Sequence, residues 1–305
     1  MLNVGVIGVG YLGQHHARIF SSIDGVRLFA VVDSDKDRAE EIADRYKCKA
    51  FTNYTDMLEN VDAVSIAAPT SAHYEIAIKC IKAGKHLLIE KPITATIEEA
   101  DELLKESENK GVILQVGHLE RFNPVVSAMY KLIKTPFFFE AERLSPFLGR
   151  GTDVDITLDL MIHDIDIVMS IINTNSVSHI RASGFKLLTE NIDYAKAWME
   201  FDNGSCGLFT ASRVSSDKSR KLTIFQNDSY IIVDYQNLEI KKFYGDGGSI
   251  AHESIKVEPK EPLKEELKDF VRCINNKTMP LVCGLKARNA LKLALEVGEK
   301  IRQGW

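Results

Sequence analysis

The chain has 305 residues, of which 45% are hydrophobic and 27% charged, so its composition is that of a globular protein and excludes a disordered one. This length is long for a single hydrophobic core and comfortable for two. A net charge of -5 offers no basic face for nucleic acid, and no apolar run approaches the roughly 20 residues that span a bilayer.

The five cysteines are scattered and contain no C-x-x-C pair. That spacing argues against a disulfide framework and against zinc, and no other ligand cluster suggests a metal. The first residues, Met1–Gly8, lack the basic start and the small-residue cleavage site of a signal peptide. We therefore expect reduced thiols in a cytoplasmic protein that holds no metal.

The first part of the chain alternates apolar runs with helical patterns. The runs predicted as buried strands are Leu2–Ile7, Val26–Val32, Ala63–Ala67, His86–Ile89 and Val112–Val116. The helical patterns between them are Tyr11–Ser21, Lys36–Tyr46, Ala72–Ala83 and Ile97–Asn109. This rhythm predicts an α/β domain over residues 1–122, with a parallel sheet covered by helices on both faces.

After Asn123 the rhythm changes to strands that follow one another directly. The predicted strands are Phe137–Arg143, Val177–Lys186, Tyr194–Phe201, Ser205–Arg213, Lys221–Gln226 and Tyr230–Asp234. The predicted helices are Pro124–Ile133, Ile156–Ile172, Leu263–Ile274 and Leu285–Gln303. Residues 123–305 are therefore expected to form an α+β domain with an open, mostly antiparallel sheet, for substrate binding and oligomerisation. The C-terminal helix can pack back on the first domain.

A G-x-G-x-x-G motif follows the first strand and opens a helix, and an acidic residue ends the next strand. The residues are Gly8, Gly10, Tyr11, Leu12 and Gly13, followed by Asp33. In this context the glycines allow a tight turn and close approach of a pyrophosphate, which sits on the helix N-terminus. Asp33 is expected to bind the adenosine ribose and to repel a 2′-phosphate. The motif thus predicts a Rossmann domain that binds NAD, with NADP less favoured although Lys36 and Arg38 are near.

Glu90-Lys91-Pro92 follows a predicted strand and therefore lies at the carboxyl edge of the sheet, where such sheets bind ligands. A lysine there can stabilise a developing alkoxide by charge and hydrogen bonding. Taken alone, the motif is better explained as a surface lysine that precedes a proline.

Asp159 and His163 lie four residues apart in a predicted helix and therefore on one face. Histidine is the usual general base near neutral pH, and a neighbouring carboxylate can orient it. Taken alone, the pair is better explained as a surface or interface pair. Asp164 and Asp166 leave open which carboxylate partners the imidazole. Of the other histidines, His16 is expected to have a packing or surface role.

The three motifs, in this order, resemble those of the glucose–fructose oxidoreductase, inositol dehydrogenase and rhizopine-catabolism family, and the resemblance covers the whole chain. It implies that Lys91, Asp159 and His163 form the catalytic set and that Glu90 lies at the cofactor. The family's P-N-x-x-H motif corresponds to Pro69, Thr70 and His73, which are further cofactor candidates even though a threonine replaces the asparagine.

Other segments are similar to the nucleotide-sugar 3-dehydrogenases within this family, most nearly those acting on UDP-N-acetylglucosamine in lipid A and lipopolysaccharide precursor synthesis. They include Gly117–Pro124, Arg143–Pro146 and Asp153–Asp166. This similarity implies oxidation of the 3-hydroxyl to a ketone that an aminotransferase consumes. The diphosphate of such a substrate calls for polar and cationic donors. The candidates are Arg121, Asn123, Arg143, Arg150 and Arg213.

Two alternatives remain. A dehydrogenase of a free polyol, inositol or another sugar would need fewer phosphate-binding arginines. A non-catalytic NAD-sensing regulatory protein would keep the fold without the reaction, although the presence of Lys91, Asp159 and His163 together counts against it. In each case an open sheet face is expected to pair into a homodimer or homotetramer.

Overall fold

The computed structural model of the chain describes residues 1–149, 151–172, 174 and 176–304. These residues form two compact units. The first comprises Met1–Leu119 together with Glu261–Arg288, and the second comprises Glu120–Lys260 together with the chain from Asn289 onward. This division differs from the predicted one, which placed residues 123–305 in a single domain apart from a possible return of the C-terminal helix. The segment that returns to the first unit is mainly the helix Pro262–Asn276, which precedes the C-terminal helix.

The first unit contains a six-stranded parallel sheet in the order β3-β2-β1-β4-β5-β6. Its strands are β1 (Leu2–Ile7), β2 (Val26–Val32), β3 (Lys49–Phe51), β4 (Ala63–Ile66), β5 (His86–Glu90) and β6 (Leu114–Gly117). Its helices are α1 (Gly13–Phe20), α2 (Lys36–Tyr46), η1 (Tyr54–Asn60), α3 (Thr70–Lys82), α4 (Ile97–Lys110) and α7 (Pro262–Asn276). The predicted Rossmann domain is confirmed. The division between the units falls within α8 (Gly284–Gln303).

Helix α7 belongs to the first unit because its apolar face completes the core beside β1 and α1. Leu267 and Phe270 are fully buried in one cluster with Val4, Val6 and Phe20. Aromatic and aliphatic side chains of this size each contribute about 1.5–3 kcal/mol when removed from water. The burial explains why a segment so distant in sequence returns to this sheet.

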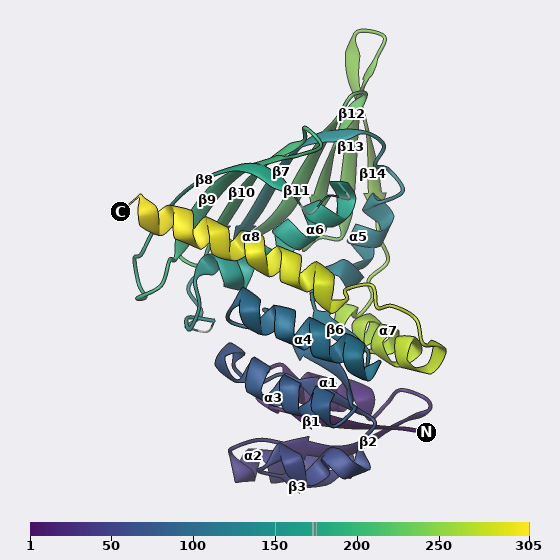
Figure 1. Cartoon of the computed structure of the whole chain (residues 1–305). Helices are drawn as coiled ribbons and strands as arrows, with labels where there is room; N and C mark the ends of the chain where they lie inside the picture. The colour runs from purple at the N-terminus through teal and green to yellow at the C-terminus, as the bar shows by residue number, and fades with distance from the viewer. Residues whose placement is uncertain (150, 173, 175, 305) are drawn as a thin grey trace. The chain divides into compact units, whose positions relative to one another are not determined.

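The second unit contains an eight-stranded sheet in the order β14-β13-β12-β11-β7-β10-β9-β8, in which only β7 and β10 pair in parallel. Its strands are β7 (Pro136–Leu144), β8 (Val177–Phe185), β9 (Tyr194–Phe201), β10 (Cys206–Ser212), β11 (Ser219–Gln226), β12 (Ser229–Asp234), β13 (Glu239–Asp246) and β14 (Ser249–Lys256). The predicted open, mostly antiparallel sheet is confirmed. The β13–β14 hairpin, which was not predicted, extends beyond the other strands (Figure 1).

Helices cover one face of this sheet (Figure 1). They include η2 (Leu119–Phe122), α5 (Pro124–Met129), η3 (Thr157–Met161), α6 (Ile162–Ile172) and the part of α8 from Asn289 onward. Phe139 and Ala141 of β7 point toward this side and are buried. Because side chains alternate along a strand, Phe138 points to the opposite face. None of the helices in the described part of the chain combines the length and apolar character needed to cross a membrane.

The opposite face of the sheet carries a row of neighbouring aromatic rings, most of them stacked, which we call the aromatic row. It consists of Trp198, Phe138, Phe225, Tyr230 and Phe243, contributed by five strands. Neighbouring ring centroids lie 4.7–5.8 Å apart. Such contacts add about 0.5–1.5 kcal/mol per pair beyond area burial, so the row stabilises a face that, among the residues described, no helix of this unit covers.

Candidate active site

The glycine loop between β1 and α1 has the close contacts that its motif predicts. A Cβ on Gly8 would lie 2.7 Å from the Ala67 carbonyl oxygen, and one on Gly13 would lie 1.7 Å from the Gly8 carbonyl oxygen. A Cβ on Gly10 would instead meet nothing within 4 Å. Gly8 and Gly13 therefore bring the helix against the strand, whereas Gly10 leaves its backbone open to a ligand.

Asp33 follows β2 and is nearly buried beside this loop. Its Oδ2 accepts a hydrogen bond of 2.9 Å from the Val9 amide, and its Oδ1 accepts one of 3.0 Å from the Asp35 amide. These two backbone bonds fix the carboxylate at the end of the strand. This is the place from which an acidic residue reaches the adenosine ribose of a bound dinucleotide.

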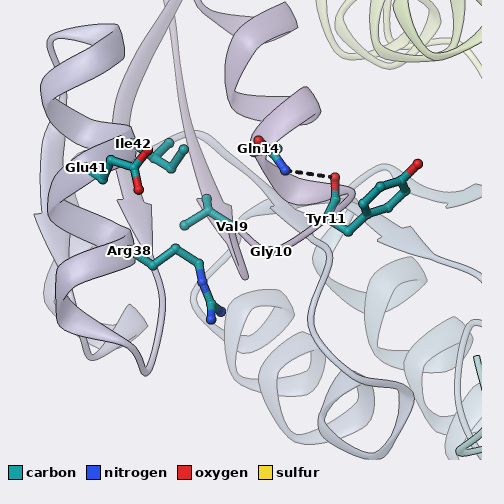
Figure 2. Close-up of a pocket in the computed structure, with 7 residues that line it drawn as sticks. All are labelled: Val9, Gly10, Tyr11, Gln14, Arg38, Glu41 and Ile42. Atoms are coloured by element: carbon teal, nitrogen blue, oxygen red, sulfur yellow. Dashed lines mark hydrogen bonds between the residues drawn. The ribbon is translucent and has the colours of Figure 1, made fainter. Parts of the chain in front are cut away.

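A cavity of about 480 Å³ opens beside the loop (Figure 2). The side chains and backbone that line it are Val9, Gly10, Tyr11, Gln14, Arg38, Glu41 and Ile42. Leu12 precedes α1 and is exposed. The open backbone at Gly10, the helix N-terminus and the carboxylate of Asp33 together match the needs of a dinucleotide's pyrophosphate and ribose, so the residues present fit NAD.

The second group of predicted cofactor residues begins α3. Pro69 precedes its first turn, which starts at Thr70, and His73 is buried within it. The His73 ring nitrogens lie 2.9 Å from the carbonyl oxygens of Pro92 and Ala68. His73 thus connects the start of α3 to the backbone that follows Lys91. This positioning role is additional to the predicted contact of His73 with the cofactor.

Glu90 ends β5 and is held by a histidine. His16 of α1 is fully buried, with Nε2 at 3.1 Å from Glu90 Oε1 and Nδ1 at 2.7 Å from Ser65 Oγ. Burial would raise the pKa of Glu90, but the hydrogen bond and charge of His16, with Lys91 and His73 nearby, hold that pKa below its ordinary value. The expected packing role of His16 therefore includes fixing the carboxylate next to Lys91.

A second carboxyl group lies buried near Glu90. Glu266 of α7 is fully buried, and neither of its carboxyl oxygens has a hydrogen-bond partner among the residues described. Burial raises its pKa well above the ordinary value, and the charges of Glu90 and Asp269 raise it further. The Gln115 side chain donates to the Glu266 backbone oxygen at 3.1 Å. No local sequence signal points to Glu266, because its neighbours come from distant segments.

Asp159 and His163 lie where the first turns of the predicted helix Ile156–Ile172 change type. Residues Thr157–Met161, which include Asp159, form a π-helical turn, and the α-helix begins at Ile162. A π turn inside a helix is an irregularity that occurs frequently at functional sites. Both side chains are half-buried, so each has a partly open approach.

The other two acids near His163 are directed toward arginines. Asp164 accepts hydrogen bonds of 3.0 and 2.8 Å from Arg143 Nε and Nη2. Asp166 Oδ2 lies 3.6 Å from Arg121 Nη1. Asp164 and Asp166 thus each have an arginine as a neighbour, and the role of Asp159 in orienting the imidazole stays a prediction.

The arginines predicted to bind substrate differ in how many of their nitrogens already bind other residues of the chain. Arg143 is almost fully buried, and its third bond, of 2.8 Å, goes to Glu120. Asp164 and Glu120 raise its pKa despite the opposing effect of burial. All of its nitrogens thus serve an internal ion cluster.

Arg121 and Arg213 retain unused donors. Arg121 Nε, and Nε and Nη1 of Arg213, are buried and have no hydrogen-bond partner in the described part of the chain. Arg213 Nη2 donates to the Val154 oxygen at 2.8 Å, and its Nε lies 3.9 Å from Asp193. Asn123 caps α5 by accepting from the Val125 amide at 3.1 Å. Arg150 lies outside the described residues.

Comparison with known proteins shows the family to which the chain belongs. Residues 2–118 match the model of an oxidoreductase family described as an NAD-binding Rossmann fold. The chain is 36% identical over 304 residues to UDP-N-acetylglucosamine 3-dehydrogenase of Acidithiobacillus ferrooxidans, covering 97% of this chain and 96% of that protein. It is 28% identical to scyllo-inositol 2-dehydrogenase (NAD(+)) of Bacillus subtilis, covering 98% and 94%.

The fold agrees with these relationships. A solved structure of the Acidithiobacillus ferrooxidans enzyme superposes with a TM-score of 0.93 at 35% identity, covering 99% of this chain and 98% of the other. Levoglucosan dehydrogenase in complex with NADH and levoglucosan superposes with a TM-score of 0.89 at 18% identity, covering 100% and 98%, which shows a shared fold. The chain therefore belongs to the glucose–fructose oxidoreductase, inositol dehydrogenase and rhizopine-catabolism family of oxidoreductases, whose N-terminal domain is an NAD-binding Rossmann fold.

Proposed function

We propose that the chain is an NAD-dependent dehydrogenase that oxidises the 3-hydroxyl of UDP-N-acetylglucosamine, or of a related nucleotide sugar, to a ketone. The observation that carries this proposal is the whole-chain similarity to the Acidithiobacillus ferrooxidans enzyme of that name, in both sequence and fold. The motif residues Lys91, Asp159 and His163 are all present for the chemistry.

In the proposed mechanism His163 removes the proton of the sugar hydroxyl, and Asp159 orients the imidazole for this step. Lys91 stabilises the negative charge that develops on the oxygen. Glu90, fixed by His16, holds a compensating charge next to Lys91. NAD, when bound, would supply the hydride acceptor for the carbon that carries this hydroxyl. Gly10, the N-terminus of α1 and Asp33 would hold its pyrophosphate and ribose.

For the substrate diphosphate, Arg121 and Arg213 are the better candidates, because both keep buried donors that hydrogen-bond to nothing in the part of the chain described. Arg143 is more plausible as a positioning residue, since its donors already bind Asp164 and Glu120. We assign Asn123 to the same supporting role as the cap of α5.

A second candidate is oxidation of a free polyol or inositol. The internal ion pairs of Arg143 favour it, because they remove one of the predicted cations from those available to a diphosphate. The similarity to scyllo-inositol 2-dehydrogenase also favours it.

We further propose a cytoplasmic homodimer or homotetramer formed through the sheet face that carries the aromatic row. The ketone product would be consumed by an aminotransferase in lipopolysaccharide precursor synthesis. The need for such a consumer follows from chemistry, because oxidation of a secondary alcohol by NAD alone is unfavourable at equilibrium.

The test is NADH formation, followed by absorbance, with purified protein, NAD and UDP-N-acetylglucosamine in the presence of a ketone trap. Turnover with the UDP-sugar, but not with free N-acetylglucosamine or inositol, supports the proposal. Activity on inositol alone favours the second candidate, and NAD binding without any turnover favours a sensor. Lys91→Met and His163→Ala should bind NADH normally and lose about 10²–10⁴-fold in kcat.

A further inference from the structure

Arg38 of α2 extends beside the glycine loop and lines the cavity there (Figure 2). An arginine at this place is a potential ligand for the 2′-phosphate that distinguishes NADP from NAD. Bidentate recognition of a phosphate by arginine uses two parallel N–H groups of the guanidinium, and the terminal nitrogens supply at least one of them. What those nitrogens already bind therefore decides which cofactor the arginine can serve.

Both terminal nitrogens of Arg38 are occupied by carboxylates. Nη1 donates to Asp33 Oδ1 at 3.3 Å and to Oδ2 at 3.4 Å. Nη2 lies 3.2 Å from Asp35 Oδ2. One positive charge is thus placed between two negative ones, so this group of three residues keeps a net negative charge, which opposes a 2′-phosphate.

We propose that Asp35 is a specificity-determining residue that selects NAD over NADP by holding the Arg38 guanidinium in this arrangement. Asp33 alone would leave Nη2 available to a phosphate, whereas Asp35 closes that position and adds a second negative charge. The inference deepens the proposed function by naming what selects the cofactor. Cofactor binding is measured without substrate, so the test stands whether or not the sugar assignment does.

Asp35 also caps α2, because its Oδ1 accepts a hydrogen bond of 3.2 Å from the Arg38 amide. Serine is an equally good capping residue without a charge. Asp35→Ser therefore removes the ion pair while it preserves the cap. The matched control is Asp37→Ser, which removes the same charge two residues along the helix. Asp37 has no ion pair with Arg38 among the residues described.

The experiment measures the dissociation constants of NADPH and NADH by nicotinamide fluorescence for the parent, Asp35→Ser, Asp37→Ser and Asp35→Ser/Arg38→Gln, each checked for folding by its melting temperature. We expect Asp35→Ser to bind NADPH about tenfold more tightly, as one charge-assisted hydrogen bond allows, with little change for NADH. The gain should be lost in the double variant. An unchanged NADPH affinity in Asp35→Ser, an equal gain in Asp37→Ser, or a gain that survives Arg38→Gln would each overturn the proposal.

Discussion

Gly151 lies against the carboxylate of Asp159, so closely that a Cβ at this glycine would lie 2.7 Å from Oδ2 and 2.9 Å from Cγ. The backbone of Gly151 is also left-handed, with φ of +66°. Real Cβ atoms do not approach other heavy atoms so closely, so any side chain at this position must displace the carboxylate. Gly151 thus provides the space in which Asp159 sits within the proposed catalytic set.

Gly151→Ala should therefore lower kcat by about 10- to 100-fold, because displacing an orienting group by about 1 Å is enough for such a loss. Affinity for NADH should not change, since the residues that fit NAD lie in the first unit. The matched control is Gly149→Ala, where φ is +65° and a Cβ would meet nothing within 4 Å. Equal losses of kcat in the two variants would indicate backbone strain in place of a displaced Asp159.

The ion cluster around Arg143 should stabilise the folded protein. Arg143→Met leaves Glu120 and Asp164 buried without their cation, which costs about 3–5 kcal/mol of unfolding free energy. Arg220 also reaches Glu120, at 3.5 Å, but its side chain is 37% exposed. Arg220→Met should therefore cost less than about 1 kcal/mol.

Urea unfolding monitored by circular dichroism measures both variants under the same conditions. A stable Arg143→Met protein with a raised KM for the sugar would contradict the structural role and restore Arg143 as a substrate ligand.

Glu266 should lower the stability of the protein at neutral pH. Its pKa is raised by burial, whereas the unfolded chain ionises near the ordinary value of 4.5. Any stability linked to this group is thus complete below pH 4.5 and falls as the pH rises toward the folded pKa. Glu266→Gln removes this loss, so its melting temperature should exceed the parent's by about 2–4 °C at neutral pH, or roughly 1 kcal/mol.

The gain from Glu266→Gln should shrink as the pH is lowered toward 4.5, which differential scanning fluorimetry across a pH series can follow. Glu265→Gln, at the next residue of α7 and close to Lys268, serves as the control and should show no such trend. A difference in melting temperature between Glu266→Gln and the parent that stays the same across the pH series would mean that folding does not raise the pKa of Glu266.

The parts of the fold that were predicted from sequence are those with a clear period. Strands β1, β2 and β9 and helix α2 were predicted with the bounds that the structure has, because each has an apolar run or stripe of the expected length. Strand β3 has only three residues, too few to show a period. Strands β13 and β14 mix charged and apolar residues without regular alternation; β13 is mostly half-buried and β14 largely exposed, so neither shows the pattern of a strand with one buried face.

The residues of the candidate site also fall into those that a local sequence pattern predicts and those that it does not. The glycine loop and Asp33 form a local motif whose geometry follows from spacing. The pairing of His16 with Glu90, the burial of Glu266 and the ion pair of Arg143 with Asp164 join distant segments, so only the folded chain shows them. Sequence identified Arg143 as a cation near the proposed substrate region, but it contained no sign that carboxylates would surround it.

The aromatic row offers a test of the proposed oligomer. Phe225 stacks on Phe138 at 5.4 Å and on Tyr230 at 5.8 Å, in the middle of this row. Phe225→Glu places a charge in the middle of this face, and burying that charge between two subunits would cost several kcal/mol. The variant should therefore be a folded monomer, whereas Phe225→Leu, which keeps an apolar side chain, should assemble like the parent.

Light scattering after size-exclusion chromatography gives the mass of each, and circular dichroism shows that the sheet is intact. A parent protein that is already monomeric, or a Phe225→Glu variant with the mass of the parent oligomer, would rule out assembly through the aromatic row.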